Sequence, residues 1–130
     1  MIKEILISGI ILVLIFTGEC ITENYTEETI DKISQDLMEM RSQIVNDKKI
    51  NVDNDKKKID DINSYIESRH DKLSYYIEHN ELNKVRTELV VLESDIDVEE
   101  YQDAVARIDN SILILNIIKE KSKFNLKNIL

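Results

Sequence analysis

Apolar residues between Thr26 and Asn46 recur at alternating spacings of three and four, at Ile30, Ile33, Leu37, Met40 and Ile44. An α-helix turns once in 3.6 residues, so this spacing places all five on one face, as in a helix that packs against partners. Asn24, with Glu27 three residues later, is a suitable N-cap. The pattern therefore predicts a helix that begins near Asn24 and ends near Asn46 and Asp47.

Two further segments repeat this pattern after a stretch without it. Residues 46–55 are rich in Asn and Asp and lose the period, which predicts the longest connection in the chain. The period returns from Asp55, where Arg69 takes one apolar position, and we expect its side chain either to pair with a carboxylate across the bundle or to extend to solvent. Asn80 suits the left-handed position that follows a helix. It separates two predicted seams, each of which is a row of apolar residues along one helix face. The seam before Asn80 is Ile59, Ile62, Ile66, Leu73 and Tyr76 or Ile77. The seam after it is Leu82, Val85, Leu89, Leu92 and Ile96.

The last predicted helix begins near Asp97, with Glu100 at the capping-box position. Residues 111–118, SILILNII, are apolar nearly all round. Such a segment is either the most buried helix of a bundle or an exposed adhesive surface, and burial is the favoured interpretation. The chain thus predicts an all-α fold, an antiparallel or coiled-coil-like bundle of about four helices. Whether the seams close within one chain or between chains stays open.

The N-terminal segment, residues 1–20, has a different character. A mainly apolar run from Ile5 to Phe16 is too short to cross about 30 Å of hydrocarbon and is typical of a signal peptide. Cys20, the single cysteine, follows it in a Thr-Gly-Glu-Cys box, so we predict a lipoprotein signal with Cys20 as the acylated residue. Ordinary cleavage with release, or an uncleaved anchor, are the alternatives. The predicted domains are a signal segment over residues 1–20 and a helical bundle over residues 21–130.

Composition narrows the class of protein. Proline is absent and both glycines, Gly9 and Gly18, lie in the N-terminal segment. A β-sandwich or a doubly wound α/β fold needs glycine at positive-φ turns, so helices remain. The formal net charge of −9 disfavours nucleic acid as a partner.

The sequence offers no catalytic or metal-binding constellation. His70 and His79 are nine residues apart and do not share a helix face as a zinc pair would. The run around Asp53 resembles a calcium loop, but Lys56 replaces its turn glycine. Without a nucleophile motif or phosphate loop, we predict a protein that is not an enzyme and needs no cofactor.

Two groups of lysines are candidate contact residues. Lys56, Lys57 and Lys58 lie in the first turn of the second helix, where positive charge opposes the helix dipole and needs compensation. The second group lies among apolar residues near the C-terminus and either favours the dipole there or forms a basic surface for anionic lipid or an acidic partner. Its members are Lys119, Lys121, Lys123 and Lys127.

The short leader, the Thr-Gly-Glu-Cys box at Cys20, the body rich in Ile, Asn, Lys and Glu and the length of 130 residues together resemble the small plasmid- and prophage-encoded lipoproteins of spirochaetes. Within that group the chain is most similar to the Borrelia hemolysin accessory proteins. The resemblance implies an exported envelope protein that acts on a small membrane-inserting, holin-like protein.

Three functions follow as hypotheses. The first is an accessory to such a pore-forming partner, and the second is a surface lipoprotein that binds a host serum or matrix protein. The third is a secreted helical virulence factor glycosylated at the Asn24-Tyr25-Thr26 sequon. A small hydrophobic reading frame next to the gene would favour the first, and a surface-antigen cluster the second.

Overall fold

The computed structural model describes the backbone of residues 2–74, 77 and 79–129, and the side chains of residues 2–14, 25–74, 77 and 80–123. Four α-helices account for nearly all of the described chain: α1 (Ile2–Asp47), α2 (Val52–Leu73), α3 (His79–Asp97) and α4 (Tyr101–Ile129). Strands are absent from these residues. The predicted all-α class is confirmed.

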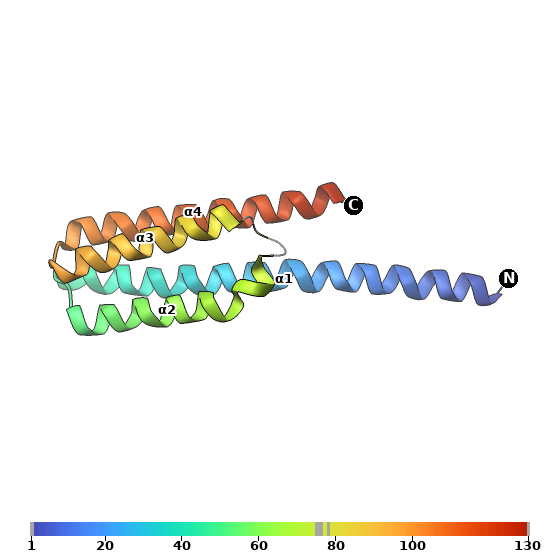
Figure 1. The fold of residues 1–130 in the computed structure, drawn as a ribbon, viewed down its shortest axis with the longest axis horizontal. Helices are drawn as coiled ribbons and strands as arrows, with labels where there is room; N and C mark the ends of the chain where they lie inside the picture. Colours follow the sequence, from blue (N-terminus) through green and yellow to red (C-terminus); the bar gives the residue numbers. More distant parts are fainter. Residues whose placement is uncertain (1, 75–76, 78, 130) are drawn as a thin grey trace.

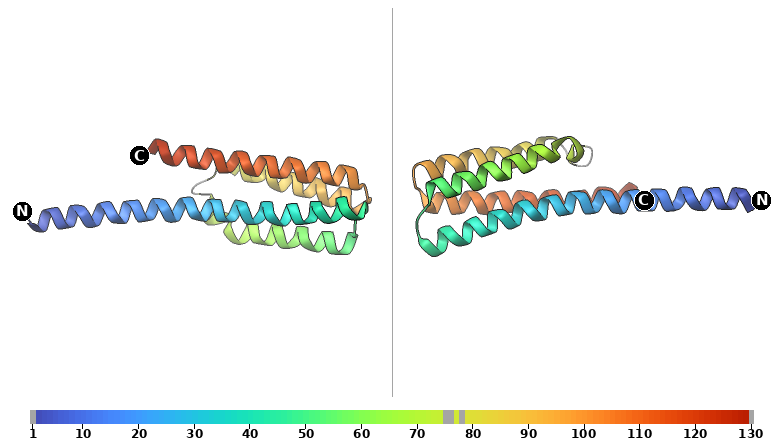
Figure 2. Two further views of the ribbon diagram at one scale, coloured as in Figure 1. Left: turned by 180° about the vertical axis from the view of Figure 1, so that it is seen from behind. Right: turned by 90° about the horizontal axis from the view of Figure 1, so that it is seen from below.

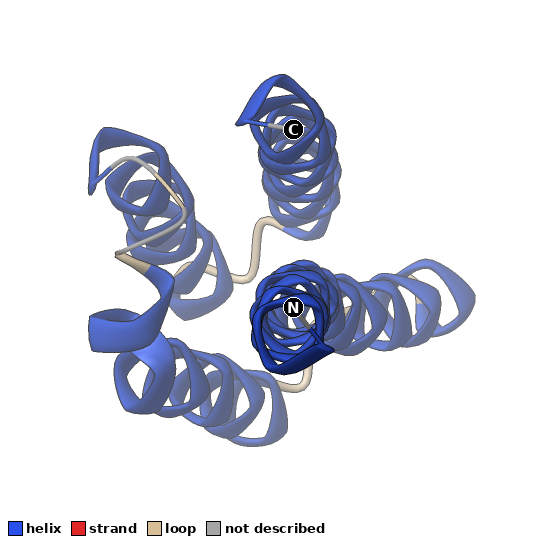
Figure 3. Cartoon of the chain, turned by 90° about the vertical axis from the view of Figure 1, so that its right-hand side faces the viewer, coloured by secondary structure: helices blue, strands red, loops and turns tan. Residues whose placement is uncertain are grey.

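The helices run up and down around a common axis and form an antiparallel bundle (Figures 1 and 3). Each packs against its two neighbours in the order α1, α2, α3, α4 and back to α1. The N-terminal part of α1 projects from one end of this bundle, and the C-terminal part of α4 extends in the same direction (Figure 2). The apolar faces of the helices therefore pack against one another within one chain. The sequence does not distinguish this arrangement from packing between chains.

The core is built from the predicted seams. Every apolar residue of the first seam is at most 2 % exposed, and the third seam is at most 5 % exposed. Burial of apolar surface at about 25 cal/mol per Å² is the main favourable term in folding, so these seams supply most of the stability. The remaining fully buried apolar side chains include Ile59 and Ile66 of α2 and Ile108 and Leu115 of α4.

Helix α4 packs more closely against α1 and α3 than α2 does. Two small residues of α4, Ala104 and Ser111, are completely buried. Small side chains on a buried face let neighbouring helix backbones approach, because less volume separates the axes. The Ser111 hydroxyl donates to the Arg107 carbonyl oxygen at 2.9 Å, so its burial leaves no unpaired donor.

The first helix differs from its predicted start. Asn24 is not an N-cap, because α1 continues without interruption from Ile2 to Asp47. The predicted signal segment and the first bundle helix therefore form one helical rod. Neither proline nor a capping turn separates them, and a run of ordinary helix-forming residues propagates a helix that the bundle already stabilises.

The first connection is shorter than predicted. The α2 helix begins at Val52 and not at Asp55, because Asn51 caps it: the Asn51 side chain accepts a hydrogen bond from the Asn54 backbone N–H at 3.4 Å. Lys48 adopts a left-handed conformation with φ of 51° at the end of α1. Ile50, only 5 % exposed, anchors the turn in the core. The Asn- and Asp-rich composition thus marked a cap and a tight turn.

The other two connections also differ from the prediction. Asn80 is not a left-handed C′ residue, because it lies in the first turn of α3 and α2 already ends at Leu73. The last helix begins at Tyr101 and not near Asp97, which is the final residue of α3. Glu99, with φ of 55°, ends α3. Its N–H donates to the Ile96 carbonyl at 3.1 Å, and the next N–H, of Glu100, donates to the Asp95 carbonyl at 3.0 Å, the Schellman pattern that commonly uses glycine.

Candidate functional site

Most of the exposed large apolar side chains in the described part of the chain lie on the N-terminal extension of α1. Its side chains are 51–76 % exposed at Ile2, Ile5, Leu6, Ile7, Ile10, Ile11, Leu12, Val13 and Leu14. A soluble monomer rarely exposes a contiguous apolar surface of this extent, so such a surface marks a membrane or protein contact. A shallow, wholly apolar groove runs along the segment between Ile5 and Leu14.

No helix in the described part of the chain has an apolar stretch long enough to span a bilayer. Cys20, the predicted lipidation site, lies within α1, but its side chain is outside the described residues. Lipidation therefore stays a prediction.

The lysines of the first turn of α2 find partners inside the molecule. The Lys56 ammonium lies 2.7 Å from a carboxylate oxygen of Asp97 on α3, and this hydrogen bond raises the pKa of Lys56 above its ordinary value. Lys58 donates to the Gln43 side-chain oxygen of α1 at 3.2 Å. Lys57 is exposed. The expected compensation of charge at this helix start thus comes chiefly from a neighbouring helix.

Three of the C-terminal lysines tie α4 to the rest of the bundle. Lys119 donates to Asp31 at 2.8 Å and lies 3.5 Å from Glu27, and Lys123 lies 3.6 Å from the same Glu27. Lys121 donates to Glu81 of α3 at 2.9 Å. Lys127 lies outside the described side chains. These contacts favour an internal role for the described lysines, and their contact with lipid or a partner stays a prediction.

The same contacts shift two pKa values. The hydrogen bond from Lys121 lowers the pKa of the nearly buried Glu81, and the hydrogen bond to Asp31 raises the pKa of Lys119. A carboxyl group whose pKa is lower in the folded protein than in the unfolded chain stabilises the fold at pH values above its unfolded pKa. This stabilisation is lost as the pH falls through its folded pKa. The raised lysine pKa contributes stability that is lost only in strongly alkaline solution. The contacts between α4 and its neighbours are therefore intact at neutral pH.

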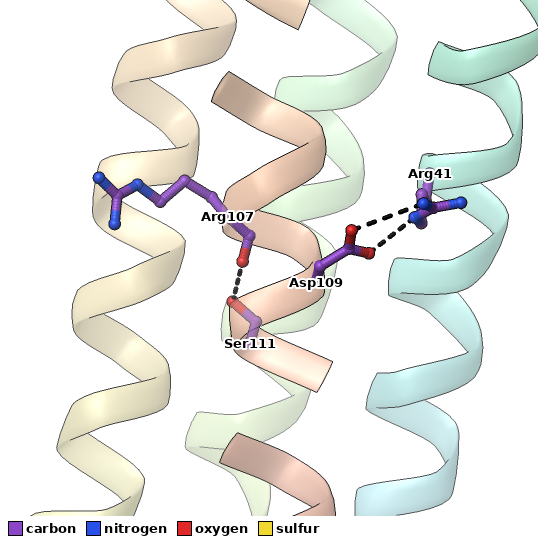
Figure 4. A network of polar contacts seen from close by, with 4 residues as sticks. All are labelled: Arg41, Arg107, Asp109 and Ser111. Atoms are coloured by element: carbon purple, nitrogen blue, oxygen red, sulfur yellow. Dashed lines mark hydrogen bonds and ion pairs between the residues drawn. The ribbon is translucent and has the colours of Figure 1, made fainter. Parts of the chain in front are cut away.

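Arginines make a second set of links around α4 (Figure 4). Arg41 of α1 holds both carboxylate oxygens of Asp109, at 2.7 and 3.5 Å. Arg107 of α4 approaches Glu88 and Asp95 of α3 at 3.5 and 3.9 Å, which is ion-pair range but too long for a strong hydrogen bond. Exposed pairs of this kind contribute at most about 1 kcal/mol each, so they set alignment more than stability.

The Arg69 side chain has neither of the two environments that the sequence predicts. It neither pairs with a carboxylate nor simply extends to solvent. Its guanidinium carbon lies over the rings of Tyr25 and Tyr65, at 4.9 and 4.7 Å from their centroids, and it donates to the Thr29 hydroxyl at 3.2 Å. Lys72 lies over the same Tyr25 ring at 4.6 Å. Aromatic side chains and cations thus fill the space between α1 and α2, where sequence periodicity showed only an interruption.

Residues 111–118 divide into two faces. Ser111, Leu115 and Ile118 are buried, whereas Leu113 and Ile117 are 59 and 43 % exposed. The favoured burial therefore holds for one face only, because a helix at the edge of a four-helix ring has a single side toward the core. The other face presents apolar side chains to solvent.

Asp55 is a buried carboxylate that the sequence did not single out. It is 0 % exposed, one of its oxygens accepts the Asn51 backbone N–H at 3.1 Å, and the other has no hydrogen-bond partner. Burial raises the pKa of Asp55, and the hydrogen bond from Asn51 opposes that effect in part. The ionised form is therefore less favourable in the folded protein than in the unfolded chain.

A raised folded pKa gives a defined pH dependence for Asp55. Its contribution to stability is most favourable below the ordinary value of 3.8 and is lost as the pH rises through the higher folded value. Asp55→Asn cannot ionise and keeps an oxygen for the Asn51 N–H. We expect the melting temperature of this variant, relative to wild type, to be higher at pH 7 than at pH 3.5.

The exposed Asp53, in the same helical turn, provides the control. The melting temperature of Asp53→Asn relative to wild type should not show this rise with pH. Melting curves of Asp55→Asn displaced equally from wild type at both pH values would contradict the assigned effect of burial.

Within the described residues, no three His, Cys, Asp or Glu side chains are grouped to hold a metal ion. The described surface instead combines an apolar helical extension, polar links between helices and a cation–aromatic cluster. These features define the class of protein as a small antiparallel helical bundle whose N-terminal helix carries an apolar surface suited to contact with a membrane or a protein.

The chain belongs to the family described as Domain of unknown function (DUF4363), whose model matches residues 20–129. This match covers the bundle and begins at Cys20. No curated protein and no solved structure matches the chain. Neither the spirochaetal resemblance nor the hemolysin accessory role has been tested by these comparisons, and both stay hypotheses.

Proposed function

We propose that this protein is a non-enzymatic, exported bundle that is held at the cell envelope by its N-terminal segment, through the apolar run if that run is retained or through acylated Cys20 if it is removed, and that binds a protein partner there. The observation that carries the proposal is the run of exposed apolar side chains from Ile2 to Leu14, on a helix continuous with the bundle. Insertion of this surface into lipid removes it from water at about 25 cal/mol per Å². The bundle itself then lies outside the hydrocarbon.

The partner is proposed to be a small membrane-inserting protein, the holin-like class that the sequence resemblance implies. Leu113 and Ile117 support this choice, because they give α4 an exposed apolar face along the bundle. An amphipathic or membrane-embedded helix is a suitable occupant of such a face. A host protein bound at the cell surface is the alternative.

Fractionation of cells that express the full chain tests the envelope location. Wild type should sediment with membranes, whereas Ile10→Asp/Leu14→Asp should move to the soluble fraction, since each aspartate costs about 2.5–3.5 kcal/mol in an apolar membrane segment. The matched control, Val90→Asp/Val98→Asp, changes two exposed valines of the bundle and should stay with membranes. A soluble wild-type protein would contradict the proposal.

Crosslinking in the membrane fraction then tests the partner. Capture of a small hydrophobic protein by wild type, and its loss in Leu113→Ser/Ile117→Ser, supports the accessory role. Capture of a host serum or matrix protein instead would favour the alternative.

A further inference from the structure

One end of the bundle faces the apolar extension, and a cation–aromatic cluster lies there. We define this cluster as Tyr25 and Thr29 of α1 with Tyr65, Arg69 and Lys72 of α2. Tyr25 is the first described side chain after the exposed apolar extension and packs against the core, and Lys72 is one residue from the end of α2. The cluster is therefore at the end of the bundle that is nearest to the exposed apolar side chains.

Arg69 differs from the other three arginines in its partners. Arg41, Arg86 and Arg107 each lie within ion-pair distance of a carboxylate. Among the described residues, Arg69 has no such carboxylate and donates a hydrogen bond to the Thr29 hydroxyl. Lys72 likewise has a tyrosine ring in place of a carboxylate. Among the described side chains, these two cations therefore lie against aromatic rings and not against carboxylates, in a protein whose net charge is −9.

The tyrosine rings leave the guanidinium able to bind an anion. A cation over an aromatic face is attracted by the ring, but the ring accepts no hydrogen bond along the guanidinium edge. The guanidinium has five N–H donors, of which Thr29 takes one. The remaining edge matches the paired oxygens of a phosphate group, and Lys72 adds a second positive charge at the Tyr25 ring.

The distance to the lipid surface fits a headgroup. Tyr25 is nine residues beyond Phe16, the last residue of the apolar run, which is about 13 Å along a helix. A headgroup layer is about 5–8 Å thick, so the cluster lies within about one Debye length of it. If Cys20 is acylated, only five residues separate Tyr25 from the anchor, about 8 Å. Whether the apolar run or acylated Cys20 anchors the chain, the cluster therefore lies close enough to be attracted by the charges of the headgroups.

We propose that Arg69 and Lys72, held by Tyr25 and Tyr65, bind the phosphate of anionic phospholipid headgroups and orient the bundle on the membrane. The inference rests on the proposed function, because the N-terminal segment must first bring the cluster to a membrane. Arginine, lysine and tyrosine are the residues that anchor proteins at the membrane–water interface. The rings reduce the freedom of the Arg69 side chain, which lowers the entropy lost on binding.

Partition of the full chain into lipid vesicles tests the inference. We would titrate the protein with vesicles of phosphatidylcholine alone and of phosphatidylcholine mixed with phosphatidylglycerol, at physiological ionic strength. The ratio of the two partition coefficients is the anionic preference. A cation near an anionic surface contributes about fivefold, so Arg69→Gln/Lys72→Gln, which removes two cations, should reduce this preference by about 25-fold while binding to neutral vesicles stays unchanged.

Matched variants separate the cluster from net charge. Lys49→Gln/Lys57→Gln removes two exposed cations at the opposite end of the bundle and should change the preference by less than about twofold. Glu28→Gln removes an exposed carboxylate one turn from Tyr25 and should raise the preference. Arg69→Lys keeps the charge and should retain more of the preference than Arg69→Gln. Because Lys72 is exposed, Lys72→Gln should reduce the anionic preference without a change in folding. Circular dichroism checks that the variant is folded.

The outcomes distinguish the two proposals. A wild-type chain that ignores neutral vesicles contradicts the proposed envelope function. A chain that binds neutral vesicles but shows no anionic preference, or an equal loss in the Lys49/Lys57 control, overturns the headgroup inference alone. A preference abolished when phosphate replaces chloride at the same ionic strength would show a site for free phosphate and would also overturn it.

Discussion

Leu89→Asp and Ile108→Asp are each expected to unfold the bundle. Both side chains are completely buried in the middle of a seam, Leu89 on α3 and Ile108 on α4. An aspartate there would lose its apolar contacts and bring a charge into the core without a partner, at a cost of several kcal/mol. A domain of this size is stable by only about 5–15 kcal/mol, and a small one lies at the lower end.

The measurement is the helical circular dichroism signal on heating. The variants should show a greatly reduced signal or a melting temperature far below that of wild type. Val90→Asp and Leu113→Asp are the controls, since these residues are 65 and 59 % exposed on the same two helices. Melting of Leu89→Asp at the wild-type temperature would mean that its seam does not face the core.

Cys20→Ser is expected to remove covalent lipid completely. The single cysteine follows the apolar run, and the family match begins at this residue. A cysteine thiolate is the nucleophile that forms an acyl–sulfur bond, which a serine hydroxyl does not replace under the same conditions. More than one acyl chain gives stable attachment to a membrane, whereas one gives only reversible binding.

Metabolic labelling with palmitate tests this prediction. Wild type should carry the label and enter the detergent phase, and Cys20→Ser should do neither. A wild-type protein that loses its leader, carries no label and stays in the aqueous phase would contradict lipidation and favour the secreted hypothesis. An unlabelled protein that keeps residues 1–20 would instead favour the uncleaved anchor.

Residue spacing along the sequence is sufficient to predict the helical class and most of the core. Ile33, Leu37 and Met40 were assigned to one face from spacing alone, because helical periodicity is a local property of the backbone. The absence of proline and of glycine beyond residue 18 removed the folds that require special turns. The apolar extension is also visible in the sequence as the mainly apolar run from Ile5 to Phe16.

Helix ends were less well predicted, because they depend on competing local contacts. Asn51 and not a residue near Asp55 caps α2, and Glu99 closes α3 in a conformation that glycine more commonly adopts. Many Asn and Asp residues in residues 46–55 were equally suitable as caps by composition. Ile50 is buried in the core, and its burial fixes the position of the turn and therefore which residue caps α2.

Only the tertiary structure decided which charges meet. Lys56 and Asp97, or Lys119 and Asp31, are far apart in the sequence, and their pairing follows from the order and alignment of the helices. The same is true of Arg69, whose position predicted an interruption of the seam but not the two tyrosines that surround it. Periodicity reports which face of a helix is buried, whereas the partner across that face is set by packing between helices.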